Sequence, residues 1–150
     1  MSVFVDTNVL LRSIEVSDPS HDLAVRAIAV LMTAGEPLVI TPQIAAEFWN
    51  VATRPRDRNG IGLTPEQASA ELTQIEDFFT LVGESTDVYN EWKRIVRLHG
   101  VSGVEAHDAR LVAAMKVYGI TKILTFNPKD FERYSGIEWL RPDMVTAWDA

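Results

Sequence analysis

The chain has 150 residues, of which 47% are hydrophobic, and its 21 acidic and 14 basic residues leave a net charge of −7. This length fits one domain spanning residues 1–150, and the lack of cysteine excludes disulfides, zinc–thiolate sites and thiol nucleophiles. The first residues, MSVFVDTNVLL, have no basic stretch before the apolar ones, and no apolar run approaches the roughly 18 residues of a membrane helix. We therefore expect a cytoplasmic protein without a membrane segment.

Short apolar runs alternate with helical patterns along the chain. Strands are predicted at residues 2–5, 38–40, 122–125 and 137–140, and helices at 8–15, 20–33, 42–53, 64–79, 87–98 and 102–118. Two helices begin at sequences typical of a capping box, Thr64 to Gln67 and Ser102 to Glu105. Strands separated by helices predict an α/β fold, with a mostly parallel sheet that is covered by helices on both faces.

Polar residues follow two of the predicted strands. Ligands of such folds bind beyond the carboxyl ends of the strands, and Asp6 comes directly after the first one. Asn127 follows the third strand within two residues, and Asp130 lies in the next turn. Each has a simpler interpretation, because Asp6 or Thr7 suits a helix cap and Asn127 precedes a proline, as turn residues often do.

Two further acids lie on the predicted inward faces of helices. Glu47 comes three residues after Ile44 and four before Val51, and Asp108 comes three residues before Leu111. A carboxylate directed into a core is costly unless it is paired or bound to a metal. A buried ion pair is the alternative for Glu47, and attraction to the helix dipole is the alternative for Asp108. Carboxylates gathered together repel one another, and Mg²⁺ or Mn²⁺ would relieve that repulsion.

Four segments have an order and spacing that extend over nearly the whole chain. They are VDTNVLL at 5–11, TPQIAAEFWNVATRP at 41–55, HDARLVAAM at 107–115 and ILTFNPKDF at 123–131. Together they resemble the PIN-domain family, specifically the VapC-type toxins of bacterial and archaeal toxin–antitoxin pairs. The resemblance implies a three-layer α/β/α sandwich and an endoribonuclease that depends on Mg²⁺ or Mn²⁺.

The resemblance also assigns roles to the matching positions. The implied metal ligands are Asp6, Glu47 and Asp108, and Asn127 joins them as a predicted catalytic residue. Thr7 would help to position a ligand or water, and Asn8 would order the pocket from behind.

The fourth position departs from the family pattern, because many PIN domains carry an aspartate near Asn127. Asp130, three residues further on, is an acid that could compensate. One less negative charge would weaken a second metal site, so the sequence leaves open whether one or two metal ions bind.

The implied partners are an RNA substrate, such as transfer RNA or another structured RNA, a cognate antitoxin and a second copy of the chain in a homodimer. Because the net charge is negative, phosphate contacts must come from local basic side chains. The candidates are Arg12, Arg54, Arg56 and Arg58. A solvated surface loop is the alternative interpretation of the last three.

Two other functions compete with this one. A catalytically weak PIN scaffold that binds RNA or protein is supported by the asparagine at position 127. A phosphoryl-transfer domain would also place an aspartate at a strand end, but phosphatases of the haloacid-dehalogenase type usually show Asp-x-Asp. Here the third residue of that pattern is Asn8.

Overall fold

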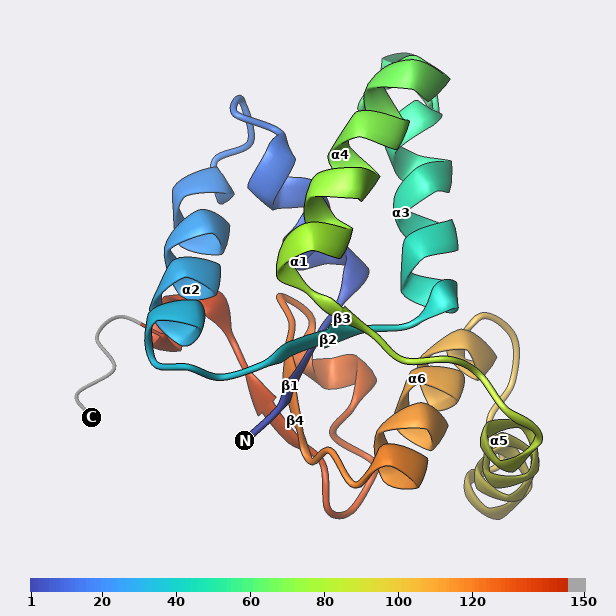
Figure 1. Ribbon diagram of the computed structural model, residues 1–150. Helices are drawn as coiled ribbons and strands as arrows, with labels where there is room; N and C mark the ends of the chain where they lie inside the picture. Colours follow the sequence, from blue (N-terminus) through green and yellow to red (C-terminus); the bar gives the residue numbers. More distant parts are fainter. Residues whose placement is uncertain (146–150) are drawn as a thin grey trace.

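A parallel five-stranded sheet lies at the centre of the protein (Figure 1). The computed structural model describes residues 1–145, so the last five residues of the predicted 1–150 domain lie outside the description. The strands are β1 (Val3–Val5), β2 (Leu38–Ile40), β3 (Thr80–Leu81), β4 (Lys122–Leu124) and β5 (Glu138–Leu140). Their order is β3-β2-β1-β4-β5, and all four neighbouring pairs are parallel, which confirms the predicted sheet.

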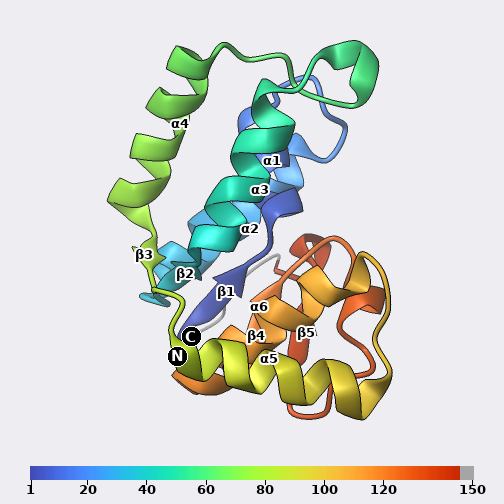
Figure 2. The same ribbon diagram turned by 90° about the vertical axis from the view of Figure 1, so that its right-hand side faces the viewer.

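Helices cover both faces of the sheet. They are α1 (Thr7–Ile14), α2 (His21–Thr33), α3 (Pro42–Thr53), α4 (Pro65–Phe78), α5 (Thr86–His99) and α6 (Glu105–Tyr118). Figures 1 and 2 show α1 to α4 on one side of the sheet, with α3 and α4 packed side by side, and α5 packed on α6 on the other side. This arrangement confirms the predicted three-layer α/β/α sandwich. Among residues 1–145, none of the helices combines the length and apolar character that a membrane crossing requires.

The inner strands are apolar throughout because they are buried on both faces. VFV of β1 and LVI of β2 are fully buried, as the continuous apolar runs of a covered parallel sheet require. The edge strand β3 was not predicted from the sequence. Both of its residues are exposed, and only their pairing with Val39 and Ile40 of β2 makes them a strand.

One of the two predicted capping boxes is present. The Thr64 side chain accepts from the Gln67 N–H, and the Gln67 side chain accepts from the Thr64 N–H. The prediction for Ser102 and Glu105 was wrong, because α6 has Val104 at its N-cap and no side-chain cap. Gly103 has a positive φ of 62°, and this turn places Ser102 outside the capping position.

The order of the strands reverses between β1 and β4. From β1 the chain first adds β2 and β3 on one side, and it later adds β4 and β5 on the other. In open α/β sheets, the crevice at such a switch point is where ligands bind. The Asp6 N–H donates to the Leu124 carbonyl over 3.0 Å, so the carboxyl ends of β1 and β4 lie directly beside each other.

Candidate active site at the carboxyl ends of the strands

Asp6 lies at the switch point and is almost fully buried, with 7% of its surface exposed. It is the N-cap of α1, and one of its carboxylate oxygens accepts the Thr7 N–H over 2.8 Å. The other oxygen accepts the Thr125 hydroxyl over 2.8 Å and the Asn8 amide over 3.3 Å. The alternative interpretation of Asp6 as a helix cap is therefore correct in geometry, and the same carboxylate also faces the predicted site.

Asn8 and Thr125 hold the first and fourth strand ends together. The Asn8 side-chain oxygen accepts the Phe126 N–H over 3.2 Å, and the Asn8 side-chain nitrogen donates to the Thr125 hydroxyl over 3.4 Å. Thr125 is completely buried, and its hydroxyl oxygen also accepts the Asn127 N–H over 3.0 Å. Both side chains thus fix the position of Asp6 and of the segment that follows β4.

Glu47 reaches the same region from the middle of α3. One of its oxygens accepts the Thr7 hydroxyl and the other accepts the Gln43 amide, each over 2.8 Å. Its neighbours Ile44 and Phe48 are fully buried, whereas Glu47 itself is half-buried. Among residues 1–145 it forms no ion pair with an arginine, so the predicted alternative of a buried salt bridge is wrong.

Asp108 lies in the first turn of α6 and is half-buried. Burial, followed by the negative charges of Asp130, Asp6 and Glu47, raises its pKa to about 7. Gln43 joins the two helices, because its amide also donates to the His107 carbonyl over 2.8 Å. This bond ties α3, which carries Glu47, to the turn that carries Asp108.

The acids of this cluster disfavour one another's ionisation. Burial raises the pKa of Asp6 to about 6 against the lowering effect of its hydrogen bonds, and the charges of Glu47 and Asp130 add to the rise. Burial and the charge of Glu105 raise the pKa of Asp130 as well. Four carboxylates therefore influence one another in one region, which is formed by the end of β1, α3, α6 and the segment after β4. Their roles in metal binding and catalysis stay a prediction.

The donor set fits a hydrated divalent cation better than a closed cage. Within the described part of the chain, no three carboxylate or imidazole side chains lie close enough to hold one metal ion directly, contrary to the three-ligand prediction. Mg²⁺ usually keeps several waters and binds through one or two carboxylates and substrate phosphates. Asp6 and Asp108, whose raised pKa values reflect burial and like charge, supply oxygen donors suited to such an ion.

Two predicted residues after β4 take different positions. Asn127 is exposed, and its side chain makes no hydrogen bond to the described residues. Asp130 ends the short 3₁₀ helix Pro128–Asp130, and its charge reaches both Asp6 and Asp108. Of the two, Asp130 has the closer electrostatic link to the site.

The predicted basic residues lie in two separate places. The Arg12 guanidinium stacks on the Phe126 ring, 4.2 Å from its centroid, beside the segment that follows β4. Arg54, Arg56 and Arg58 lie at the end of α3 that is remote from the sheet (Figure 1). Arg54 donates to the Asn59 carbonyl, Arg56 pairs with Glu15, and Arg58 is exposed. Contact of these side chains with RNA stays a prediction.

Sequence reasoning missed two residues that organise the site. Gln43 lies four residues before Glu47 in α3, a spacing that puts both on one helix face and could have revealed the pair. Thr125 directly follows β4, at a strand end like Asp6, and was assigned only to the strand. Both are buried polar side chains that bond a predicted acid.

A cluster of acids at the switch point of a parallel α/β sheet is typical of α/β proteins that bind a hard cation. Residues 3–137 match the PIN domain, and the chain therefore belongs to the PIN-domain family. None of the curated proteins compared with the chain matches it.

Solved structures of toxin–antitoxin proteins have a similar fold. VapBC-1 from nontypeable Haemophilus influenzae is 15% identical, with a TM-score of 0.69 over 95% of this chain and 99% of that chain. VapBC2 from Rickettsia felis, solved with a bound DNA fragment from its promoter, is 14% identical, with a TM-score of 0.67 over 94% of this chain and 98% of that chain. VapC20 from Mycobacterium tuberculosis, a Sarcin-Ricin loop cleaving toxin, is 19% identical, with a TM-score of 0.63 over 87% and 94%. At these identities the likeness establishes the fold.

Proposed function

We propose that this chain is a Mg²⁺- or Mn²⁺-dependent endoribonuclease that acts as the toxin of a toxin–antitoxin pair. The crowding of Asp6, Glu47, Asp108 and Asp130 at the switch point is the observation that carries this proposal. Such crowding costs free energy unless the site holds a cation, and membership of the PIN-domain family supports a nuclease. Transfer RNA and other structured RNAs are the proposed substrates.

The side chains of the site have distinct tasks in this proposal. Asp6 and Asp108 would hold the cation, and Glu47 would contact it through a bound water. The cation would supply Lewis acidity toward a phosphate oxygen and make water a stronger nucleophile near neutral pH. Thr7 donates its hydroxyl to Glu47 and so fixes the direction of that carboxylate. Asn8 supports Asp6 from behind through its amide. The exposed Asn127 amide would orient water or substrate.

Substitution of the two strongly perturbed acids tests the proposal. Asp6→Asn and Asp108→Asn should each remove RNA cleavage and leave the circular dichroism spectrum of the fold unchanged. EDTA should stop cleavage by the wild type, and Mn²⁺ should restore it. Near-normal Mg²⁺-dependent cleavage by either variant would refute the assigned roles.

The same experiment decides between the enzyme and a PIN scaffold that only binds RNA or protein. If the chain is a scaffold, the wild-type protein should bind RNA in the presence of Mg²⁺ or Mn²⁺ without cleaving it. The enzyme predicts metal-dependent cleavage, and mapping the cleavage ends in total cellular RNA then identifies the substrate.

An apolar groove supports an antitoxin as partner. It has a volume of about 480 Å³ between α1, α2 and α4, and exposed Val16 and Phe78 line it together with Phe79. Similar folds come from toxin–antitoxin complexes, among them one from Klebsiella pneumoniae. We assign this groove to an apolar helical segment of the antitoxin, since helices commonly bind their partners through such a face.

The antitoxin assignment is tested with the product of the gene that neighbours this one. Phe78→Glu should weaken its binding, because a charge would enter an apolar contact, while RNA cleavage by the free variant should persist. Unchanged binding would remove the groove from the proposal. The proposed homodimer is checked separately, by light scattering of the purified chain.

A further inference from the structure

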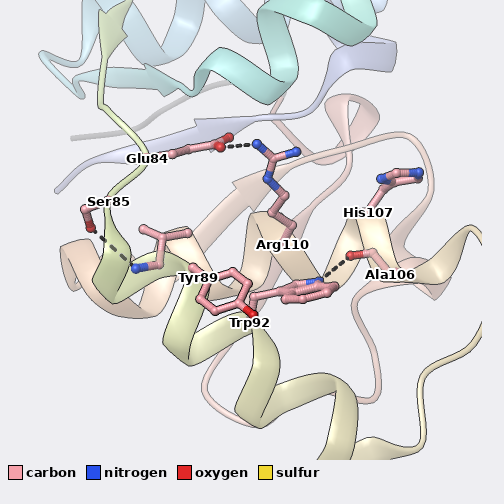
Figure 3. A pocket seen from close by; sticks show the side chains of 8 residues that line it. Glu84, Ser85, Tyr89, Trp92, Ala106, His107 and Arg110 are labelled. Atoms are coloured by element: carbon pink, nitrogen blue, oxygen red, sulfur yellow. Dashed lines mark hydrogen bonds and ion pairs between the residues drawn. The ribbon is translucent and has the colours of Figure 1, made fainter.

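A second hollow lies beside the acidic site, between α5 and α6. It has a volume of about 360 Å³, and Tyr89, Trp92, His107 and Arg110 are among the residues that line it. Figure 3 shows the Tyr89 and Trp92 rings next to each other, with the Arg110 side chain extended toward Glu84. None of the roles proposed so far uses this cavity.

The cavity adjoins a hollow that Glu47 lines. That hollow is lined by Gln43 as well, and it shares His107 and Arg110 with the cavity. Gln43 also bonds the His107 carbonyl, so the wall between the two hollows is part of the hydrogen-bond network of the site. A molecule that occupies both hollows would therefore contact His107 and Arg110 between Glu47 and the aromatic rings.

The aromatic wall of the cavity combines a fixed ring with an exposed one. The Trp92 indole N–H donates to the Ala106 carbonyl over 2.9 Å, which fixes the ring against α6. The Tyr89 ring lies 5.9 Å from it, centroid to centroid, and 55% of the Tyr89 residue is exposed. Two flat π surfaces are thus available at little cost in side-chain entropy.

A paired cation lines the same cavity. Arg110 forms an ion pair with Glu84, and 42% of its side chain remains exposed. Glu84 also lies 3.3 Å from the Gln43 N–H, so Arg110 is tied to the start of α3. The guanidinium group can attract a phosphate that approaches the otherwise acidic region, and its flat face can stack on a planar ring.

We infer that the cavity between α5 and α6 binds one unpaired nucleobase of the RNA, next to the phosphate held at the acidic site. The inference rests on the proposed nuclease function and names the substrate feature that the site reads. Single-stranded bases are commonly bound by stacking on aromatic side chains and arginine planes. The cavity combines both and adjoins the hollow that Glu47 lines.

A nucleobase fits these observations better than a protein segment does. An apolar peptide would leave the Arg110 guanidinium without a new partner, whereas a nucleotide carries a phosphate that it can bind. The apolar groove between α1, α2 and α4 is larger and lies apart from this cavity, since the two share no lining residue.

A double-mutant cycle tests the inference. Oligoribonucleotides that contain one abasic position, moved step by step along the chain, are compared with the intact oligomer for binding to wild type and to Tyr89→Ala. Binding is measured by fluorescence anisotropy in the Asp108→Asn background, where no cleavage is expected. Leu98→Ala is the matched control, since Leu98 is exposed on the same helix and does not line the cavity.

Loss of one stacked base should weaken binding by about ten-fold, and Tyr89→Ala should weaken binding of the intact oligomer similarly. One abasic position should remove the base that stacks in the cavity, and for that oligomer Tyr89→Ala should cause no further loss of affinity. Tyr89→Phe keeps the ring and should bind every oligomer as the wild type does. Additive effects at every position, or equal effects of Leu98→Ala, would overturn the inference. So would a Tyr89→Ala variant that changes only antitoxin binding or oligomeric state.

The nuclease proposal and this inference fail in different ways. If the wild type cleaves no RNA while the abasic position and Tyr89→Ala still show coupled losses of RNA affinity, the nuclease is refuted and the base site is retained. Metal-dependent cleavage without coupling would retain the nuclease and refute the base site. Absence of all RNA binding would refute both.

Discussion

Replacement of Asp6 by asparagine should remove a loss of stability that the metal-free wild type undergoes as the pH rises. Burial raises the pKa of this carboxyl from 3.8 to about 6, so folding disfavours its ionised form. Asparagine is an equally good N-cap, and its side-chain oxygen can still accept the Thr7 N–H. The substitution therefore removes the buried charge and keeps the bond to Thr7, but the amide group that replaces the second oxygen no longer accepts from Thr125 and Asn8. The loss of these bonds does not depend on pH, so the pH dependence of the effect isolates the charge.

The size and sign of the effect follow from linkage. Because the pKa in the folded state is the higher one, the stabilising contribution of the protonated carboxyl is complete below 3.8 and is lost as pH rises through about 6. At about 1.4 kcal/mol for each unit of pKa, the whole loss is about 3 kcal/mol. About 1.4 kcal/mol of it falls between pH 5 and pH 8.

Urea unfolding at pH 5 and pH 8 in EDTA measures this difference. The free energy of unfolding of Asp6→Asn, relative to wild type, should rise by about 1.4 kcal/mol from the lower to the higher pH. Asp57→Asn removes the same charge from an exposed position and serves as the control. If the free energy of unfolding had the same pH dependence in wild type and Asp6→Asn, the argument that the buried charge is costly would be refuted.

Metal binding provides a second arm of the same experiment. A ligand that binds only the folded state stabilises it in proportion to the logarithm of its concentration above the dissociation constant. Mg²⁺ or Mn²⁺ should therefore raise the stability of the wild type at pH 8 and have a much smaller effect on Asp6→Asn. Equal stabilisation of both proteins would exclude Asp6 as a ligand.

Three further predictions concern other parts of the molecule. Gly60→Ala should destabilise the fold by about 1–3 kcal/mol in urea unfolding, since the new Cβ would lie 1.8 Å from the Arg54 carbonyl oxygen. Gln43→Leu should lower kcat for RNA cleavage by about ten-fold, because Glu47 loses a hydrogen bond that positions it. Lowering the pH from 8 to 5 should weaken Mn²⁺ affinity measured by calorimetry, because the raised pKa values of Asp6 and Asp108 leave both carboxyls mainly protonated at pH 5.

Each of these predictions has a clear contrary result. Wild-type stability of Gly60→Ala would show that the loop can move away from Arg54. An unchanged kcat for Gln43→Leu would mean that Glu47 keeps its position by its bond to Thr7 alone. Mn²⁺ affinity that does not depend on pH would separate the carboxylates from metal binding.

The sequence alone was sufficient for the order of most elements and for the acids of the site. Asp6 follows a short apolar run, and Glu47 and Asp108 interrupt apolar helix faces, so local periodicity reveals all three. The same local patterns could not locate β3, because Thr80 and Leu81 bury nothing and are a strand only through their pairing with β2. They also misplaced the start of α6, where the conformation of Gly103 overrides the capping sequence.

Only the tertiary structure decided how these residues meet. Thr125 and Gln43 act through partners 119 and 64 residues away in the chain, Asp6 and the His107 carbonyl, and no local pattern encodes such distances. The reversal of strand order between β1 and β4 brings Asp6 beside Thr125. The packing of α5 on α6 likewise forms the cavity at Trp92, because a hollow exists only between elements that have already folded together.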